Sequence, residues 1–134
     1  MPDSILLSSP LFDGNEQKYV QSVLNSPYVA AGGSFLEDFE KGFSARLFPH
    51  NLIGLNSGTS AIHIGLMLLG VQSGDEVICQ SFTFCASANP IVYLGALPIL
   101  VDSEIETWNM CPDALEEAIK DRLSKGKKPK AIVV

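Results

Sequence analysis

Apolar residues recur along this chain with two different periods, and the period changes near residue 51. Before that point, the segments 14–26 and 34–48 carry apolar side chains three and four positions apart, which is the spacing of one helix face. After it, short continuous apolar runs alternate with longer amphipathic segments. The pattern predicts two helices, followed by an alternation of strands and helices.

The first two expected helices have recognisable limits. The helix over 14–26 ends before Pro27, and the connection over 26–33 is an exposed loop of mostly small residues. Ser34 is the expected N-cap of the helix over 34–48, with Glu37 three residues further on as in a capping box. The apolar faces carry Tyr19, Val20, Val23 and Leu24 in the first helix and Phe35, Leu36, Phe39, Phe43 and Leu47 in the second.

The remainder predicts an α/β fold, a mainly parallel sheet with helices on both faces. Parallel strands are buried on both faces and therefore read as short continuous apolar runs, and they need crossover connections, which helices usually supply. Such strands are expected near Ile53, Val77, Ile99 and Ile132. The connecting helices are expected after Thr59, Ala86 and Asp113, with Gly70 ending the first and Pro90 in the first turn of the second.

Composition limits the classes of function. The chain has 134 residues, 46% hydrophobic and 18% charged, which is enough for a globular domain with a sizeable core. A net charge of −6 argues against a nucleic-acid partner, whose phosphates need a basic face. Six of the nine Lys and Arg residues fall within 120–130, which we interpret as a solvated helix end and loop, with a basic tail as the alternative.

The cysteines and the hydropathy profile indicate a compartment. Cys79, Cys85 and Cys111 are odd in number and lack CxxC spacing, so neither a disulfide framework nor a metal site is expected. The first residues have no basic start with a long apolar core, so no signal peptide is expected. No apolar run reaches the roughly 20 residues that a membrane span needs. We therefore expect a cytoplasmic protein without a membrane partner.

The stretch 56–60, NSGTS, stands where an expected strand ends and a helix begins. Ligands of open α/β sheets gather at such points, and the first N–H groups of a helix can hold an anion. Gly58 would let a ligand approach the backbone, and the hydroxyls of Thr59 and Ser60 could donate to phosphate oxygens. No Gly-Lys-[Ser/Thr] follows, so this is not a Walker loop. Taken alone, the stretch favours an ordinary N-cap over a phosphate site.

The next strand end, QSFTF, contains two phenylalanines. Phe82 is expected to be a core residue. Phe84 could also be core, but a planar ring at the carboxyl end of a strand could instead stack on a flat cofactor.

Other candidate residues have simpler interpretations. His63 is interpreted as a packing histidine, His50 as a loop residue without a recognisable partner, and Asp75 and Asp102 as turn residues. No Ser–His–Asp set, Cys–His set or carboxylate pair can be assembled, so no catalytic residue is assigned.

Five stretches of the chain, taken in order, resemble one known family: GNEQKYV, SPYVAAGGSFLEDFE, LNSGTSAIHIGL, GDEVICQSFTFCASANPIVYLGALPILVD and TWNMCP. They are similar to the amino-terminal part of DegT/StrS-type nucleotide-sugar aminotransferases, fold-type-I enzymes that use pyridoxal phosphate (PLP). The nearest group aminates UDP-linked 4-keto-6-deoxysugars of the bacillosamine type. The resemblance implies that residues 1–134 form the amino-terminal part of the PLP-binding large domain, with a helical segment over 1–50 and the start of the α/β sheet over 51–134.

The resemblance also implies roles for the cofactor residues. Gly58, Thr59 and Ser60 would receive the cofactor phosphate, and Phe84 would stack on the pyridine ring. An amino donor, usually glutamate, would convert PLP to pyridoxamine phosphate (PMP), which then aminates the keto group of a nucleotide-linked deoxysugar. The product would serve the synthesis of surface polysaccharide or glycoprotein glycans.

The substrate site implied by the resemblance lies in a homodimer whose two subunits both help to build each pocket. Pro27, Tyr28, Val29 and Ala30, together with Gly58, would line the keto-sugar site.

The Schiff-base lysine and the aspartate facing the pyridine nitrogen are implied to follow Val134, so this chain alone is expected to be inactive. Two other classes stay open. The chain could be a non-catalytic α/β module that binds phosphate or a nucleotide, or a structural fragment that associates through its helices and a sheet edge.

Overall fold

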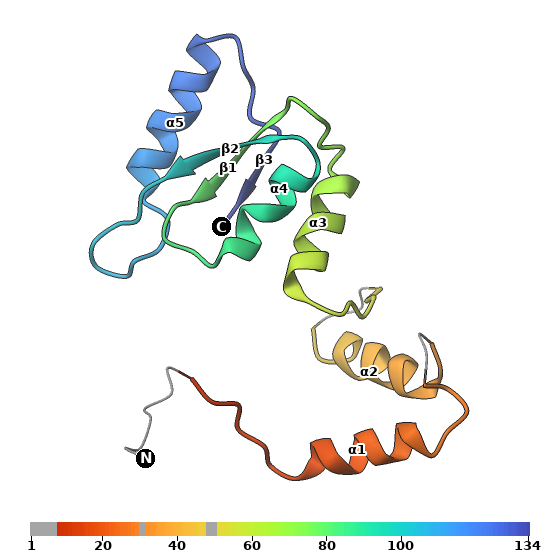
Figure 1. The fold of residues 1–134 in the computed structure, drawn as a ribbon. Coiled ribbons are helices and arrows are strands. Elements are labelled where there is room, and N and C mark those ends of the chain that lie inside the picture. The colour runs from red at the N-terminus through yellow and green to blue at the C-terminus, as the bar shows by residue number, and fades with distance from the viewer. Residues whose placement is uncertain (1–7, 30–31, 48–50) are drawn as a thin grey trace, which may run out of the picture. The chain divides into compact units, whose positions relative to one another are not determined.

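The computed structural model describes residues 8–29, 32–47 and 51–134, and the chain divides into two compact units, Met1–Gly54 and Leu55–Val134 (Figure 1).

The first unit contains the two helices predicted from the apolar spacing. They are α1, Asn15–Leu24, and α2, Ser34–Ser44. An apolar hollow of about 660 Å³ is lined by residues of both helices, among them Val20, Leu24 and Phe39. No residue of either helix is buried. The two apolar faces therefore exist as predicted, but remain exposed.

The expected N-cap of α2 is wrong by one residue. Ser34 is the first helical residue, and Gly33 is the N-cap, with φ 99° and no capping side chain. This φ lies in the left-handed region that favours glycine. A Cβ at Gly33 would also come within 2.9 Å of the Tyr28 Cβ. Backbone conformation and the close approach of Tyr28 thus decide where the helix begins.

The second unit is an α/β unit whose strands are β1 Glu76–Gln80, β2 Leu97–Val101 and β3 Ala131–Val133. They form a parallel sheet with the order β2-β1-β3. The helices are α3 Gly58–Leu68, the short 3-10 helix η1 Cys85–Ser87, α4 Asn89–Tyr93 and α5 Pro112–Ser124. Their limits are close to those predicted: Gly70, with φ 73°, follows the end of α3, and Pro90 lies in the first turn of α4.

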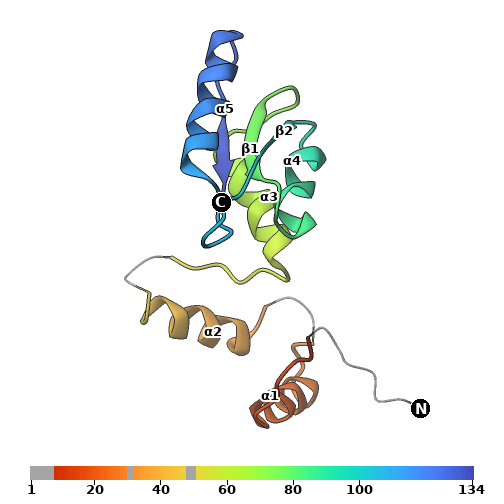
Figure 2. The ribbon, with the colours of Figure 1, turned by 90° about the vertical axis from the view of Figure 1, so that its left-hand side faces the viewer.

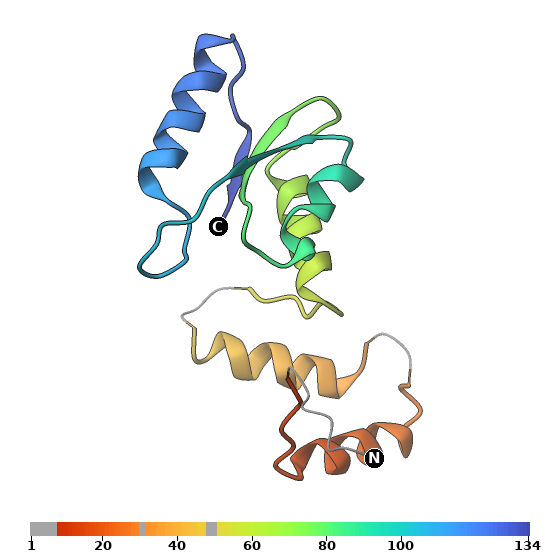
Figure 3. The same cartoon turned by 60° about the vertical axis from the view of Figure 1, so that its left-hand side comes forward.

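Helices cover both faces of the sheet, as predicted. Figures 2 and 3 show α5 on one side of the strands and α3 with α4 on the other. Alternation along β1 explains this, since Val77 and Cys79 belong to the core under α3 and α4, whereas Ile78 belongs to the core under α5. All three side chains are fully buried.

The strand predicted near Ile53 does not form. Residues 51–55 have no regular structure, and β1 already has a hydrogen-bonded neighbour on each side. The backbone N–H of Gly54 donates instead to Glu40 Oε1, at 2.8 Å. A Cβ at Gly54 would lie 2.7 Å from Leu36 Cδ1. This segment therefore packs on α2 in the first unit and pairs with no strand.

A charged group is buried at the start of β1. Glu76 is 5% exposed, and its Oε1 lies 3.6 Å from Nη1 of Arg122 on α5. Arg122 also pairs with Asp121, which is the main reason that its pKa is raised. Glu76 Oε2 has no hydrogen-bond partner in the described part of the chain. The carboxylate therefore depends on one cation from α5.

Candidate functional site

The carboxyl ends of the three parallel strands meet at one edge of the sheet, and one candidate residue of the second unit, Phe84, follows such an end. The others, Gly58, Thr59 and Ser60, open α3 before the first strand. The turn after β1 leads through Phe84 into η1, and η1 contacts α3. Because α3 runs toward the start of β1, its first residues lie toward the carboxyl edge. Ligands of open α/β sheets bind outside this edge.

The first turn of α3 is capped, and two of its backbone donors have no acceptor among the described residues. Ser57 is extended, with φ −162° and ψ 158°, and its Oγ accepts the N–H of Ser60 at 3.1 Å. The hydroxyl of Ser60 donates to Asn56 Oδ1 at 2.7 Å. Within the described residues, the N–H groups of Gly58 and Thr59 meet no acceptor, as expected for the first turn of a helix.

This geometry changes one detail of the sequence prediction. The first N–H groups of this helix are the expected anion donors, but that of Ser60 is held by the side chain of Ser57, which is a favourable N-cap residue. Gly58 takes its place as an outward donor, and a Cβ added at Gly58 would meet no atom within 4 Å. Two backbone donors at the positive end of a helix dipole, beside an open Cβ position, fit an anion.

Phe84 stands on a well-defined turn with its side chain outside the core. It is 78% exposed, and its carbonyl accepts the N–H of Ser87 at 2.9 Å. The hydroxyls of Thr83 and Ser87 share a hydrogen bond of 2.8 Å. The core alternative for Phe84 is thereby wrong, while its stacking on a cofactor stays a prediction.

The prediction that Phe82 is core is also wrong. Its side chain is 62% exposed, and its ring lies against that of Trp108, with centroids 5.1 Å apart and planes tilted by 56°. Trp108 belongs to the loop after β2, far along the chain, so the local apolar pattern contained no sign of this neighbour.

Two functional candidates were missed from the sequence, Gln80 and Trp108. Gln80 ends β1, and its Nε2 donates to Ser103 Oγ at 2.8 Å and to the carbonyl of Trp108 at 2.6 Å. Trp108 has φ 64°, which is the left-handed region. The sequence does contain a signal for Gln80, because it is a polar amide at the end of an apolar strand. No sequence pattern indicates that Trp108 has a left-handed backbone.

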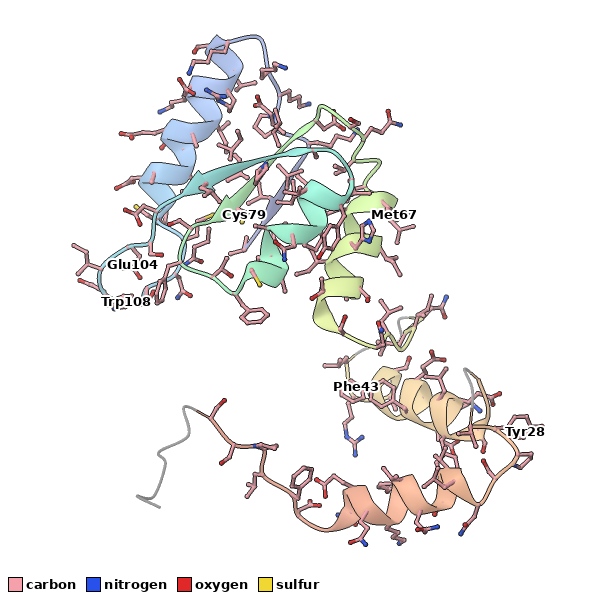
Figure 4. The ribbon with its side chains drawn as sticks, in the orientation of Figure 1. Tyr28, Phe43, Met67, Cys79, Glu104 and Trp108 are labelled. Atoms are coloured by element: carbon pink, nitrogen blue, oxygen red, sulfur yellow. The ribbon has the colours of Figure 1, made fainter. Side chains whose placement is uncertain are left out.

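The loop between Asp102 and Met110 carries Trp108 and Glu104 close together (Figure 4). The Thr107 hydroxyl and the Glu106 and Thr107 N–H groups donate to Glu104, and these bonds, the Thr107 hydroxyl first, lower the pKa of its carboxyl. A hollow of about 370 Å³ beside this loop is lined by Phe82, Asp102, Ser103, Glu104, Ile105 and Trp108.

The interpretations of three other polar residues are confirmed. Asp75 Oδ2 accepts the N–H of Gln72 at 2.8 Å, and Asp102 Oδ1 accepts the following N–H at 2.8 Å, so both stabilise turns. The ring of His63 lies edge-on to that of Tyr93, with centroids 5.8 Å apart. His63 is therefore a packing residue.

The loop predicted to line a sugar site connects α1 and α2 in the first unit. Pro27, Tyr28 and Val29 are exposed, and the N–H of Tyr28 donates to Ser26 Oγ at 3.2 Å. Figure 4 shows Tyr28 on this connection. Ala30, like His50, lies outside the described residues. The role of the loop stays a prediction.

The described part of the chain carries no candidate for a metal site or a membrane span. No group of three or more His, Cys, Asp or Glu side chains there could hold a metal ion. None of the helices described is both long enough and apolar enough to cross a membrane.

Sequence comparison places these residues in a family. The sequence model of the DegT/DnrJ/EryC1/StrS aminotransferase family matches residues 10–134. The chain belongs to this family. Its members include PLP-dependent aminotransferases, so the family recognised from the five sequence stretches is confirmed.

Individual relatives agree with this assignment. EpsN of Bacillus subtilis (strain 168) is 44% identical over 133 residues, covering 99% of this chain and 34% of EpsN. The GDP-perosamine synthase of Caulobacter vibrioides is 39% identical over 118 residues, covering 88% of this chain and 32% of the synthase. NtdA of Bacillus subtilis, solved with bound PMP, has a TM-score of 0.74 at 30% identity, covering 98% of this chain and 31% of NtdA.

The chain spans about a third of the length of the curated relatives that it matches. The fold of this part is the α/β arrangement of the solved sugar aminotransferases, as predicted.

Proposed function

We propose that this chain forms the cofactor-phosphate side of a PLP-dependent aminotransferase that acts on a nucleotide-linked keto-sugar. The observation that carries the proposal is the start of α3, where the N–H groups of Gly58 and Thr59 meet no acceptor among the described residues, in a chain of this family. A phosphate dianion suits this place, because its oxygens accept charge-assisted hydrogen bonds and the helix dipole favours negative charge.

The remaining residues take supporting roles. The Thr59 hydroxyl is a further donor, while Ser57, Ser60 and Asn56 hold one another and so keep the first turn of α3 in shape. When bound, PLP supplies the electron sink for amino transfer. The exposed ring of Phe84 is proposed as the wall on which the flat cofactor rests.

The substrate proposal rests on the relatives and on the resemblance. GDP-perosamine synthase is a relative whose name indicates a nucleotide-linked sugar. We propose the loop at Pro27, Tyr28, Val29 and Ala30 as part of the sugar site, glutamate as the amino donor, and a homodimeric cytoplasmic enzyme of surface-glycan synthesis.

We also propose that the 134-residue chain alone does not catalyse transamination. Covalent capture of the cofactor needs a lysine at the carboxyl edge of the sheet. The seven lysines lie in α1, α2 and α5 or between α5 and the start of β3, and none follows a strand end. Lys120 and Lys125 are paired with Glu116 and Asp121 on the surface of α5.

The test exchanges Gly58 in the full-length polypeptide that carries these residues. Gly58→Pro deletes one N–H at the first helical position, where proline is tolerated, and extended Ser57 suits a following proline. Gly58→Ala is the matched control, because it keeps the N–H and its Cβ would meet no atom within 4 Å. PMP is the probe, because it has no aldehyde and reports non-covalent binding alone.

Loss of one charge-assisted donor is expected to weaken PMP binding by about 1.5–3 kcal/mol in Gly58→Pro, measured by titration calorimetry. The affinity of Gly58→Ala for PMP should stay within about threefold of the wild-type affinity. This is a small change, because a tenfold change in affinity corresponds to about 1.4 kcal/mol. Equal losses in both variants would mean that the ligand occupies the open Cβ position. Unchanged binding in both would contradict the phosphate site, and equal affinity for PMP and inorganic phosphate would favour a simple phosphate-binding module.

A further inference from the structure

Gln80 uses its whole side-chain donor capacity on one loop. Its amide nitrogen carries two hydrogens, and these go to Ser103 Oγ at 2.8 Å and to the Trp108 carbonyl at 2.6 Å. Both acceptors lie after β2, while Gln80 is the last residue of β1. One side chain thus ties the end of the central strand to the neighbouring loop.

The residue held in this way has a backbone that needs support. Trp108 has φ 64°, and it is the one non-glycine residue with positive φ among those described. Residues with a Cβ are strained in the left-handed region and stay there only when their surroundings hold them. The short hydrogen bond from Gln80 acts on the carbonyl of this same residue.

The Trp108 ring connects the loop that Gln80 holds to the turn after β1. It lies against Phe82, with ring centroids 5.1 Å apart, and Phe82 is two residues before Phe84. The same turn is fixed at its start by the Ser81 N–H, which donates to the Val101 carbonyl at 2.8 Å. The Phe82 ring contact is thus the tie between the middle of this turn and the loop that Gln80 holds.

We infer that Gln80 is a positioning residue for the Phe84 ring, acting through the Trp108 backbone and the Phe82 ring contact. The inference rests on the proposed function, in which the Phe84 ring forms a wall of the cofactor site. A turn held in place before binding loses little conformational freedom when the cofactor arrives, whereas a released turn must be ordered at the expense of affinity.

The test is the nearly isosteric Gln80→Glu substitution in the full-length polypeptide. A carboxylate cannot donate, so its oxygen would face the Trp108 carbonyl without a hydrogen between them. Ser103→Ala is the control, because it removes the other acceptor and leaves the bond to Trp108 possible. Trp108 is the single tryptophan of these 134 residues, so its fluorescence reports on the loop. Emission from any tryptophan elsewhere in the full-length polypeptide is measured in a variant without Trp108 and subtracted.

Three readouts are measured: the emission maximum of Trp108 without cofactor, the affinity for PMP, and the circular dichroism of the bound PMP band. We expect Gln80→Glu to shift the emission to longer wavelength, to weaken PMP binding about tenfold, and to reduce the dichroism of the band. Ser103→Ala should leave all three near the wild-type values. A role in stability alone would move the unfolding midpoint but neither affinity nor dichroism.

The outcomes separate this inference from the proposed function. If the wild type binds PMP and Gln80→Glu binds it with the same affinity, the positioning role is overturned, whether or not the emission shifts. The proposed function is then unaffected. Absence of PMP binding to the wild type refutes the proposed function and this inference with it. If Gln80→Glu does not fold, Phe82→Leu breaks the ring contact while leaving both Gln80 hydrogen bonds, and unchanged PMP affinity there overturns the inference.

Discussion

Both units of this chain contain amphipathic helices, but they bury very different fractions of their apolar side chains. In α1 and α2 no residue is buried, and large apolar side chains such as Phe39 and Leu24 are at least half exposed. In the second unit, β1 alone contributes three fully buried apolar side chains, and α4 contributes Ile91. An apolar face therefore predicts a helix, but burial follows only where the chain also supplies a sheet to cover it.

The largest effect is expected from matched truncations in the two units. Ile91→Ala removes a fully buried side chain from the core under α3 and α4 and should lower the free energy of unfolding by about 3 kcal/mol. Leu24→Ala on α1, where the side chain is 58% exposed, should change it by less than about 0.5 kcal/mol. Urea unfolding followed by far-ultraviolet circular dichroism measures both. Equal losses would show that α1 is as well covered as the sheet.

A smaller effect is expected from the polar contact that secures α5. Arg122→Met keeps the aliphatic stem but leaves the buried Glu76 carboxylate without its cation, which should destabilise the protein by about 2–3 kcal/mol. The control is Lys120→Met on the same helix, where the pair with Glu116 is exposed and contributes about 1 kcal/mol or less. Thermal unfolding of both variants, compared with the wild type, gives the difference. Equal effects would mean that Glu76 remains hydrated.

The smallest effect concerns pH and the loop that carries Trp108. Hydrogen bonds from the loop hold the pKa of Glu104 below the usual range of glutamate. A lowered folded-state pKa contributes stability that is present above the unfolded pKa and is lost as the pH falls through the folded one. Trp108 emission should therefore be constant above about pH 5 and change below about pH 4. In Glu104→Gln this change should be absent; an identical acid transition there would assign it to another group.

The alternation of the second half was enough to predict most of the fold. Short apolar runs gave β1, β2 and β3, and the amphipathic segments between them gave the helices on both faces. The segment around Ile53 has the same apolar appearance but pairs with neither outer strand of the described sheet, β2 or β3. Its backbone N–H at Gly54 finds the Glu40 side chain instead, a tertiary contact that no local pattern contains.

The candidate site was predictable where it depends on local chemistry. The sequence around Gly58 contains the helix start, its cap and its small residues, so the donors at Gly58 and Thr59 follow from it. The partners of Phe82 and Gln80 lie more than 20 residues further along the chain, in a loop whose Trp108 has a left-handed backbone. Period and composition carry no information on such a pairing.

The strand order β2-β1-β3 has a consequence for the synthesis of this protein. A ribosome releases β1 first, yet β1 ends in the middle of the sheet. One edge of β1 can pair only after residues 97–101 are made, and the other only after residues 131–133 are made. The helix α5 is synthesised between these two segments. Until the last of these emerges, the strand that is most deeply buried in the finished sheet exposes unpaired N–H and C=O groups, which are templates for pairing with other chains. Nascent chains stalled before Ala131 should therefore be those that most need a chaperone.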